Sequence, residues 1–463
     1  MEWIRTVALC QLVIDGERKG LHWFVVPLRD RETGECLPGV TAGDLGPKAG
    51  RHGLDSGYIR FTHVRVPRRN MLMRWAKLDA DGSFTPAPTQ EIAYATLVGE
   101  RVYLLYFLLS DAAAAITIAT RFSAARLQGP ERQSLLFYQS HQTQLMPIIA
   151  GLYATRSVAV AQEAQWISIQ GGLSEGKEIE FLLSVQELHA MSAGLKAWCS
   201  WWCADAIEAA RRAMGGHSFS QHSGIPTIQA DFGVHTQGGG PGAVVAQQNS
   251  RYVLAQFKKA RNGHPTVSSC QYLTAKWQQA KELAQPWQLE STANLSDPRT
   301  LLTLMQWLAW RMAQRAADGI AASVAAGASQ FDAWNNCMDM ALDTSRAHTF
   351  LLIFSSFVGV LESELASNRH DPSVVPALQR LVTLNGLHTL QRELGFLLEF
   401  GLINAVQASA IRAGVVTFCK LVRADAVGYV RLLVLVLAPR CSSANSRDIG
   451  WLPQLYDRYY WYY

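Results

Sequence analysis

The residues best suited to chemistry gather in one segment, Met214 to Arg251, which is rich in glycine and carries three histidines and two prolines. A helical pattern runs into Gly215-Gly216, and a second helix is predicted to begin near Ala243. Loops held between rigid helices are where binding and catalytic groups concentrate. We therefore expect this segment to be a loop that contains a functional site.

The glycines near the end of this segment suggest a phosphate-binding loop. Gly238 to Gly242 reads G-G-G-P-G before a helix, an arrangement that could cradle a phosphate group. No strand pattern leads into it and no Gly-Lys-Ser/Thr follows, so this signal is weak. Between Asp231 and Lys258 the sequence has no Asp or Glu, and the glycines therefore have no neighbouring carboxylate in the sequence.

Composition bounds the class of protein. The chain has 463 residues, of which 49% are hydrophobic and 17% charged, as in a globular protein of two or three domains. The net charge of +5 comes without blocks of like charge, so no nucleic-acid partner is expected. The eight cysteines lack metal-ligand spacing, and no metal site is expected. No apolar run reaches the roughly 20 residues of a membrane helix, so we expect no membrane span.

The elements that must hold the loop change from strand to helix along the chain. Thr6–Ile14 and Leu21–Pro27 read as two strands of a hairpin joined at Asp15-Gly16, and Tyr58–Phe61 returns to strand alternation. From Glu91 onward the hydrophobic period is helical. The predicted helical stretches are 92–128, 134–170 with an interruption at Pro147, 185–214, 243–260, 300–326, 347–366 and 374–421. The chain is thus predicted to be mostly α with a small β domain.

The central segment resembles the acyl-CoA oxidases, in which G-G-H-G-Y-S, S-G-[LI]-P and [FY]-E-G-[ED]-N-T-V-x-x-x-Q stand at these spacings. Gly43–Lys48 and Val66–Leu72 resemble blocks of that family's small β domain. The resemblance covers roughly residues 1–425. It implies an FAD-dependent oxidoreductase of peroxisomal fatty acid β-oxidation, which oxidises acyl-CoA to trans-2-enoyl-CoA and passes electrons to oxygen to give hydrogen peroxide.

The resemblance also implies a fold of the acyl-CoA dehydrogenase/oxidase type, a partial β barrel followed by two helical bundles. Residues 1–75 would be a remnant of the middle β domain, 76–262 the first bundle with the FAD and acyl-CoA site, and 263–463 a second helical domain with an atypical tail. The family's helical amino-terminal domain and its W-W-P-G-G-L-G-type loop would precede Met1, so we expect a shortened form. A peroxisomal location rests on the resemblance, since the ending Tyr-Trp-Tyr-Tyr is no S-K-L signal.

One family residue is missing. The family's catalytic base, which removes the α proton of the acyl group, is the first acid of E-G-[ED]-N. The motif is anchored on Val244, Gln247, Gln248 and Arg251, which places that base at Gly239, or at Gly238 if the register is one residue out. Neither glycine can accept a proton, so one interpretation is a catalytically silent acyl-CoA- and FAD-binding pseudoenzyme.

A second interpretation keeps the activity. Some relatives in the wider acyl-CoA dehydrogenase superfamily carry the base on another helix, in a D-L-E-R-type stretch that Leu97–Arg101 resembles. Glu100 is therefore the candidate relocated base, expected to be half-buried beside the flavin. Alternatively Glu100 is solvated or pairs with Arg101 or Lys48, and the chain is silent or serves as a subunit for a full-length partner.

The candidate cofactor residues come from two further matches. Arg121–Gln128 resembles the family's R-Y-S-x-x-R-x-Q, in which the second arginine and the glutamine face the FAD pyrophosphate and adenosine, largely across a dimer interface. These positions are Arg126 and Gln128, so a homodimer is expected. Gly215 and Gly216 match glycines that allow backbone to approach the cofactor. The alternatives are a surface cation at a helix end and a glycine C-cap.

Overall fold

The computed structural model describes residues 4–88, 95–176, 178–283, 287–367 and 373–437. The chain divides into two compact units. The first comprises Met1–Gly99 and Ile169–Gln186, and the second comprises Glu100–Ser168 and Glu187–Tyr463.

Strands in the first unit form short antiparallel pairs. The pair β1 (Arg5–Ile14) and β2 (Glu17–Pro27) is joined by Asp15-Gly16, whose φ angles of 51° and 82° are those that a tight Asp-Gly hairpin turn requires. The predicted hairpin is therefore confirmed. The other pairs are β3 (Val40–Asp44) with β4 (Gly57–Phe61) and β5 (Lys77–Leu78) with β6 (Phe84–Thr85). In the described residues these are separate two-stranded sheets, with no closed barrel.

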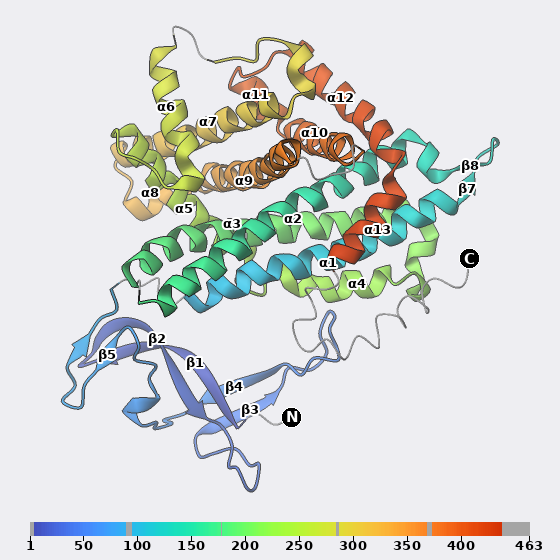
Figure 1. The fold of residues 1–463 in the computed structure, drawn as a ribbon. Helices are drawn as coiled ribbons and strands as arrows, with labels where there is room; N and C mark the ends of the chain where they lie inside the picture. The colour runs from blue at the N-terminus through green and yellow to red at the C-terminus, as the bar shows by residue number, and fades with distance from the viewer. Residues whose placement is uncertain (1–3, 89–94, 177, 284–286, 368–372, 438–463) are drawn as a thin grey trace. The chain divides into compact units, whose positions relative to one another are not determined.

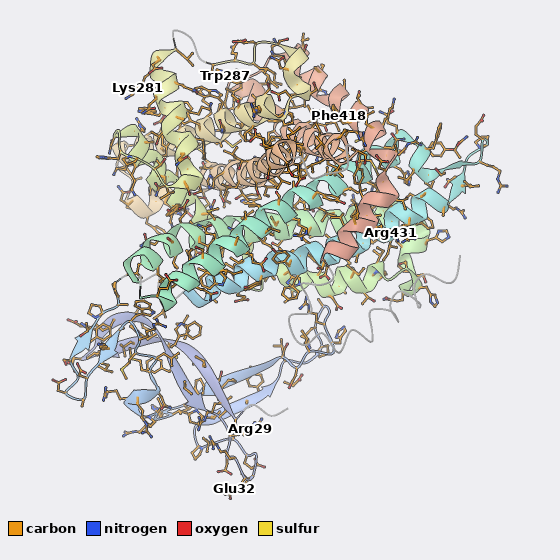
Figure 2. All side chains as sticks on the ribbon, in the orientation of Figure 1. Arg29, Glu32, Lys281, Trp287, Phe418 and Arg431 are labelled. Atoms are coloured by element: carbon orange, nitrogen blue, oxygen red, sulfur yellow. The ribbon has the colours of Figure 1, made fainter. Side chains whose placement is uncertain are left out.

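Helices build the second unit (Figure 1). The first long helices, α1 (Ala95–Ala125), α2 (Gln139–Ser174) and α3 (Glu178–Ala213), are tied to one another by side-chain hydrogen bonds. The later helices pack on the same core: α5 (Gly242–Arg261), α6 (Gln271–Glu282), α7 (Pro298–Ala325), α8 (Gln330–Asn336), α9 (Met338–Ala366), α10 (Val374–Arg392), α11 (Leu394–Glu399), α12 (Ala405–Arg423) and α13 (Ala426–Leu437). Apolar side chains fill the space between these helices, whereas Lys281 and Arg431 are exposed (Figure 2).

Small residues let the long helices approach closely. Four alanines of α1 are almost fully buried, and Gly151 of α2 faces the indole of Trp202 on α3. A Cβ atom on Gly151 would overlap that ring. Because protein interiors are close-packed, even one added carbon must be accommodated by movement of a neighbour.

Several predicted boundaries were wrong. The predicted interruption at Pro147 does not occur, because α2 runs through it, with Met146 and Ile149 fully buried on either side. A proline removes one helical hydrogen bond, and packing of the neighbours offsets that loss here. The stretch 374–421 is divided into α10, α11 and α12, the last beginning at a capping box of Asn404 and Gln407. The predicted loop after α3 contains a helix of its own, α4 (Ile225–Phe232), and short 3₁₀ turns.

Three helices are long and apolar enough to cross a membrane by length and composition: Leu97–Ala125, Met338–Ala366 and Ala405–Arg423. The sequence argument that no stretch is sufficiently apolar was therefore wrong. In α1, 67% of the apolar window is buried inside the fold, so packing accounts for much of its hydropathy. The other two windows are 39% and 33% buried.

Candidate active site

The structure brings Glu100 and Gly239 together. Glu100 lies near the beginning of α1, and Gly239 lies in the turn between η6 (Gly233–Thr236) and α5. A Cβ atom on Gly239 would stand 3.6 Å from the Oε1 atom of Glu100 and 3.3 Å from the Cδ2 atom of Leu104. A side chain at position 239 would thus start beside the Glu100 carboxylate.

Two buried cations hold the turn that contains Gly239. Arg101, only 3% exposed, donates from Nε to the carbonyl oxygen of Gly239 at 3.1 Å. Lys196 on α3 is fully buried, and its Nζ donates to the carbonyl oxygens of Thr236, at 3.3 Å, and Gly240. The turn is therefore fixed by side chains from α1 and α3.

Burial shifts the pKa of both cations. Desolvation lowers the pKa of Arg101, and the nearby Glu100 carboxylate opposes that shift. Desolvation and then the charge of Arg101 lower the pKa of Lys196 to about 8, again opposed by Glu100. A buried lysine with a strongly lowered pKa beside a candidate base is typical of functional sites.

The Glu100 side chain is exposed, so its predicted half-burial is wrong for this chain. Its neighbour Arg101 turns inward to the 239 turn, while Glu100 sits at the edge of the site. Glu100 forms no ion pair among the described residues of its own unit, and in the other unit Lys48 donates to the carbonyl oxygen of Leu54. The carboxylate is consequently accessible to a substrate.

Backbone geometry explains the glycines. Gly239 and Gly240 have φ angles of +72° and +110°, which favour glycine over residues with a Cβ atom. Gly238 has an ordinary φ angle, but a Cβ atom there would lie 3.1 Å from the carbonyl oxygen of Val234. The backbone conformation of the turn and the space around it therefore favour glycine at positions 238, 239 and 240.

The candidate cofactor residues meet at the other ends of α1 and α3. Arg126 follows α1, and Gln128 lies on β7 (Leu127–Gln128), which pairs with β8 (Gln133–Ser134). The ring of Phe122 lies 5.2 Å from that of His217, which brings the segment after α3 against the end of α1. Arg126 and Gln128 are exposed, and Arg126 forms no ion pair in the described part of the chain.

Gly215 and Gly216 leave open space beside the backbone. An added Cβ atom would meet nothing within 4 Å at either position. Gly215 has a φ angle of +59° just after α3, so the C-cap interpretation also applies. Phe219, in the same 3₁₀ turn, is 89% exposed.

Sequence reasoning missed two residues of the candidate active site. Lys196 is the only charged residue between Ala193 and Trp202, a signal that the sequence did contain. His189, also on α3, lies with Nδ1 3.5 Å from the Nη1 atom of Arg101. Within the described residues no group of three His, Cys, Asp or Glu side chains could hold a metal ion.

Family models now identify the class of protein. Residues 94–254 match the C-alpha1 domain of acyl-CoA oxidase, and residues 297–431 match the model named acyl-CoA oxidase. The helical unit and its candidate site thus coincide with the family's matched regions. The chain belongs to the acyl-CoA oxidase family.

Individual relatives agree. The chain is 31% identical to peroxisomal acyl-coenzyme A oxidase 1 of Rattus norvegicus over 432 residues, which are 92% of this chain and 64% of that protein. Acyl-coenzyme A oxidase 3 of Yarrowia lipolytica is 30% identical over 435 residues, 92% of this chain and 60% of that protein. The chain therefore spans less than two thirds of the length of these relatives.

Solved structures share the fold. Acyl-CoA oxidase-1 of Caenorhabditis elegans, complexed with FAD and ATP, matches with a TM-score of 0.80 at 28% identity, covering 94% of this chain and 64% of that one. Acyl-CoA oxidase-2 of the same organism, bound with FAD, ascaroside-CoA and ATP, matches with a TM-score of 0.81 at 25% identity, covering 98% and 70%.

Proposed function

We propose that this chain is an FAD-dependent acyl-CoA oxidase of peroxisomal fatty acid β-oxidation in which Glu100 serves as the catalytic base. The observation that carries the proposal is the 3.6 Å between the Glu100 carboxylate and the Cβ position of Gly239, where the family motif has its glutamate. A base can act from either attachment point if its carboxylate reaches the same carbon, because geometry is the first requirement for proton transfer.

FAD fits the residues present. Arg126 offers an exposed guanidinium, unpaired among the described residues, whose forked donors suit a pyrophosphate, and Gly215-Gly216 leaves backbone uncovered just after α3. Gln128 can hydrogen bond to the polar part of the cofactor. When bound, the flavin accepts the β hydrogen as hydride and passes the electrons to oxygen.

The chain's own residues supply the other half of the reaction. Glu100 removes the α proton of the acyl-CoA, and Arg101 and Lys196 hold the neighbouring turn in one conformation through its carbonyl oxygens. Their positive charges also lie near the carboxylate, since the charge of Glu100 opposes the lowering of both pKa values. A preorganised turn reduces the motion needed when substrate binds.

A homodimer is part of the proposal. Leu127, Phe137 and Phe219 are 47%, 52% and 89% exposed, on the hairpin with Arg126, just after it, and in the glycine turn. Exposed apolar side chains on segments that the Phe122–His217 contact brings near each other offer a surface for a partner. A second copy would cover them and bring its cofactor to Arg126.

The second candidate function is a silent acyl-CoA- and FAD-binding protein. The exposure of Glu100 favours it, because a base that works beside a flavin is usually shielded from water.

Flavin reduction distinguishes the two functions. The protein, saturated with FAD, is mixed anaerobically with saturated acyl-CoAs of several lengths. An oxidase loses its flavin absorbance and produces hydrogen peroxide when air is admitted. Binding without loss of absorbance at any chain length would establish the silent protein instead.

A further inference from the structure

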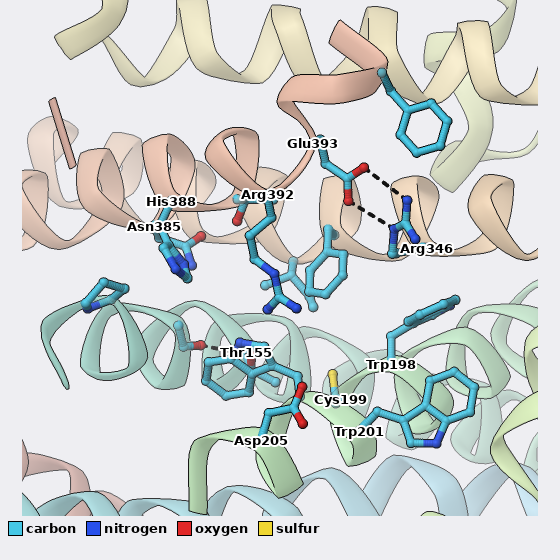
Figure 3. A pocket seen from close by; sticks show the side chains of 17 residues that line it. Thr155, Trp198, Cys199, Trp201, Asp205, Arg346, Asn385, His388, Arg392 and Glu393 are labelled. Atoms are coloured by element: carbon cyan, nitrogen blue, oxygen red, sulfur yellow. Dashed lines mark hydrogen bonds and ion pairs between the residues drawn. The ribbon is translucent and has the colours of Figure 1, made fainter. Parts of the chain in front are cut away.

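A cavity separate from the candidate active site lies inside the helical unit (Figure 3). Its volume is about 370 Å³, and its walls come mainly from α2, α3, α9 and α10. Cavities of this size are in the range that holds small ligands. None of the residues proposed for the flavin or the α proton lines it.

One wall is a row of polar side chains on α10. Asn385, His388 and Arg392 are three and four residues apart, so they lie on one face of the helix. Figure 3 shows all three reaching into the space opposite α2 and α3. Asn385 is only 8% exposed and makes no side-chain hydrogen bond to the described residues. With no protein partner among the described residues, the donors and acceptor of this amide are open to water or to a ligand in the cavity.

Arg392 supplies a positive charge that no carboxylate neutralises within the described chain. The other arginine of the cavity, Arg346, is already paired, with two 3.0 Å hydrogen bonds to Glu393 and a 3.0 Å ion pair to Asp343. Burial, and secondarily the charge of Arg392, lower the pKa of His388 to about 4, so that imidazole is neutral at pH 7. Arg392 is therefore the cation available to a ligand.

The facing walls are aromatic. Trp198 and Trp201 of α3 meet edge to face with ring centroids 4.9 Å apart, and Trp202 lines the same side. Phe350 and Phe396 line the cavity from α9 and α11. Flat rings next to a cation and an amide select a ligand that is itself flat and charged at one end.

We infer that this cavity binds a small planar aromatic molecule carrying one anionic group, with its ring against the tryptophans and its acid on Arg392 and Asn385. Asp205, an exposed carboxylate lining the α3 side, acts against the anion and therefore limits the affinity. The ligand would bind without contact to the candidate active site.

The test is calorimetric titration of the full chain with naphthoate and with its uncharged amide as the matched probe. Naphthoate is expected to bind, and Arg392→Gln to weaken it about tenfold while leaving the amide unchanged, because a charged hydrogen bond is lost. Asn385→Ala should weaken both probes, and Asp205→Asn should strengthen naphthoate binding. Arg412→Gln, which changes an exposed arginine of α12, is the control and should have no effect.

If a substitution on α10 disturbs folding, Asp205→Asn still tests the inference. It changes only an exposed side chain, and stronger naphthoate binding by this variant is the expected result. Equal affinity for naphthoate and the amide, no response to Arg392→Gln in the folded variant, or no binding of either probe would overturn the inference.

Discussion

The Oε1 atom of Glu100 lies 3.6 Å from the point where a Cβ atom on Gly239 would stand. In our proposal the base of the family motif would be carried by position 239, and the Glu100 carboxylate of α1 lies beside that position. The acid that we propose is missing at position 239 and the acid present at Glu100 therefore belong to the same part of the site. This relationship makes substitutions at the two positions informative about each other.

Restoring an acid at position 239 should partly replace Glu100. In a Glu100→Gln background, Gly239→Glu is expected to recover some α-proton abstraction, because the new side chain starts beside the lost carboxylate. The φ angle of +72° and the contact with Leu104 should reduce stability by about 1–3 kcal/mol. Gly239→Gln carries the same strain without the acid and is the matched control. Equal activity of the Glu and Gln variants would count against a shared site.

Lys196 should give stability a distinctive pH dependence. Its pKa is about 8 in the folded chain against the ordinary 10.5, so between these values the unfolded state binds more protons. This contribution therefore increases the free energy of unfolding as pH rises from about 8 to 10.5. Lys196→Met should remove it. Because other groups titrate at high pH, the quantity to compare is the difference between variant and parent in chemical denaturation.

The exposed Lys259 on α5 provides the control for that experiment. Lys259→Met should leave the slope unchanged. Glu100→Gln should move the lower end of the window to lower pH and leave its upper end unchanged, because the Glu100 charge raises the pKa of Lys196 only in the folded chain. A slope that is the same in Lys196→Met and the parent would contradict the assignment.

Two glycines of α2 should respond in opposite ways to the same substitution. Gly151→Ala is expected to destabilise the protein by about 1–3 kcal/mol, since the new methyl group overlaps the indole of Trp202. Gly171 has nothing within 4 Å of an added Cβ atom, so Gly171→Ala should stabilise the helix by up to about 1 kcal/mol. Thermal unfolding of both variants measures the difference. Destabilisation by Gly171→Ala as large as that by Gly151→Ala would show that backbone effects dominate.

Arg126 should matter for the cofactor and not for the fold. Arg126→Gln is expected to weaken FAD binding about tenfold, because a charged hydrogen bond to phosphate is lost. Arg132→Gln, in the same hairpin, is the control. Fluorescence titration gives the affinity for FAD. Light scattering gives the oligomeric state, which we expect to be a dimer. Tight, stoichiometric binding by Arg126→Gln would exclude this role.

Local rules predicted local structure well. Asp15-Gly16 between two apolar runs was enough for the hairpin, and the glycines after α3 marked the end of that helix. Pro147 misled because its effect on a helix depends on packing by residues distant in sequence. The placement of Lys196 under the 239 turn could not be predicted either, since nothing in the sequence near position 239 specifies which helix supplies a cation.

The residues of the candidate active site were predicted by resemblance, but their distances from one another and their exposure were not. The motif pointed to Gly239 and Glu100 separately, and only the fold shows how close they are. The exposure of Glu100 was missed because a helical period that is apolar on most sides does not reveal which side remains open.

Exchange of the α proton of a saturated acyl-CoA in deuterated water tests the central claim most directly, because it reports proton abstraction without requiring oxygen. The FAD-loaded protein is expected to catalyse exchange, and Glu100→Gln to reduce its rate by about 10²–10⁴-fold, as loss of a general base does. The control is Glu163→Gln. The carboxylate of Glu163, on α2, accepts a hydrogen bond from the Tyr106 hydroxyl, and its replacement should leave the exchange rate unchanged. Exchange that persists undiminished in Glu100→Gln would contradict the account.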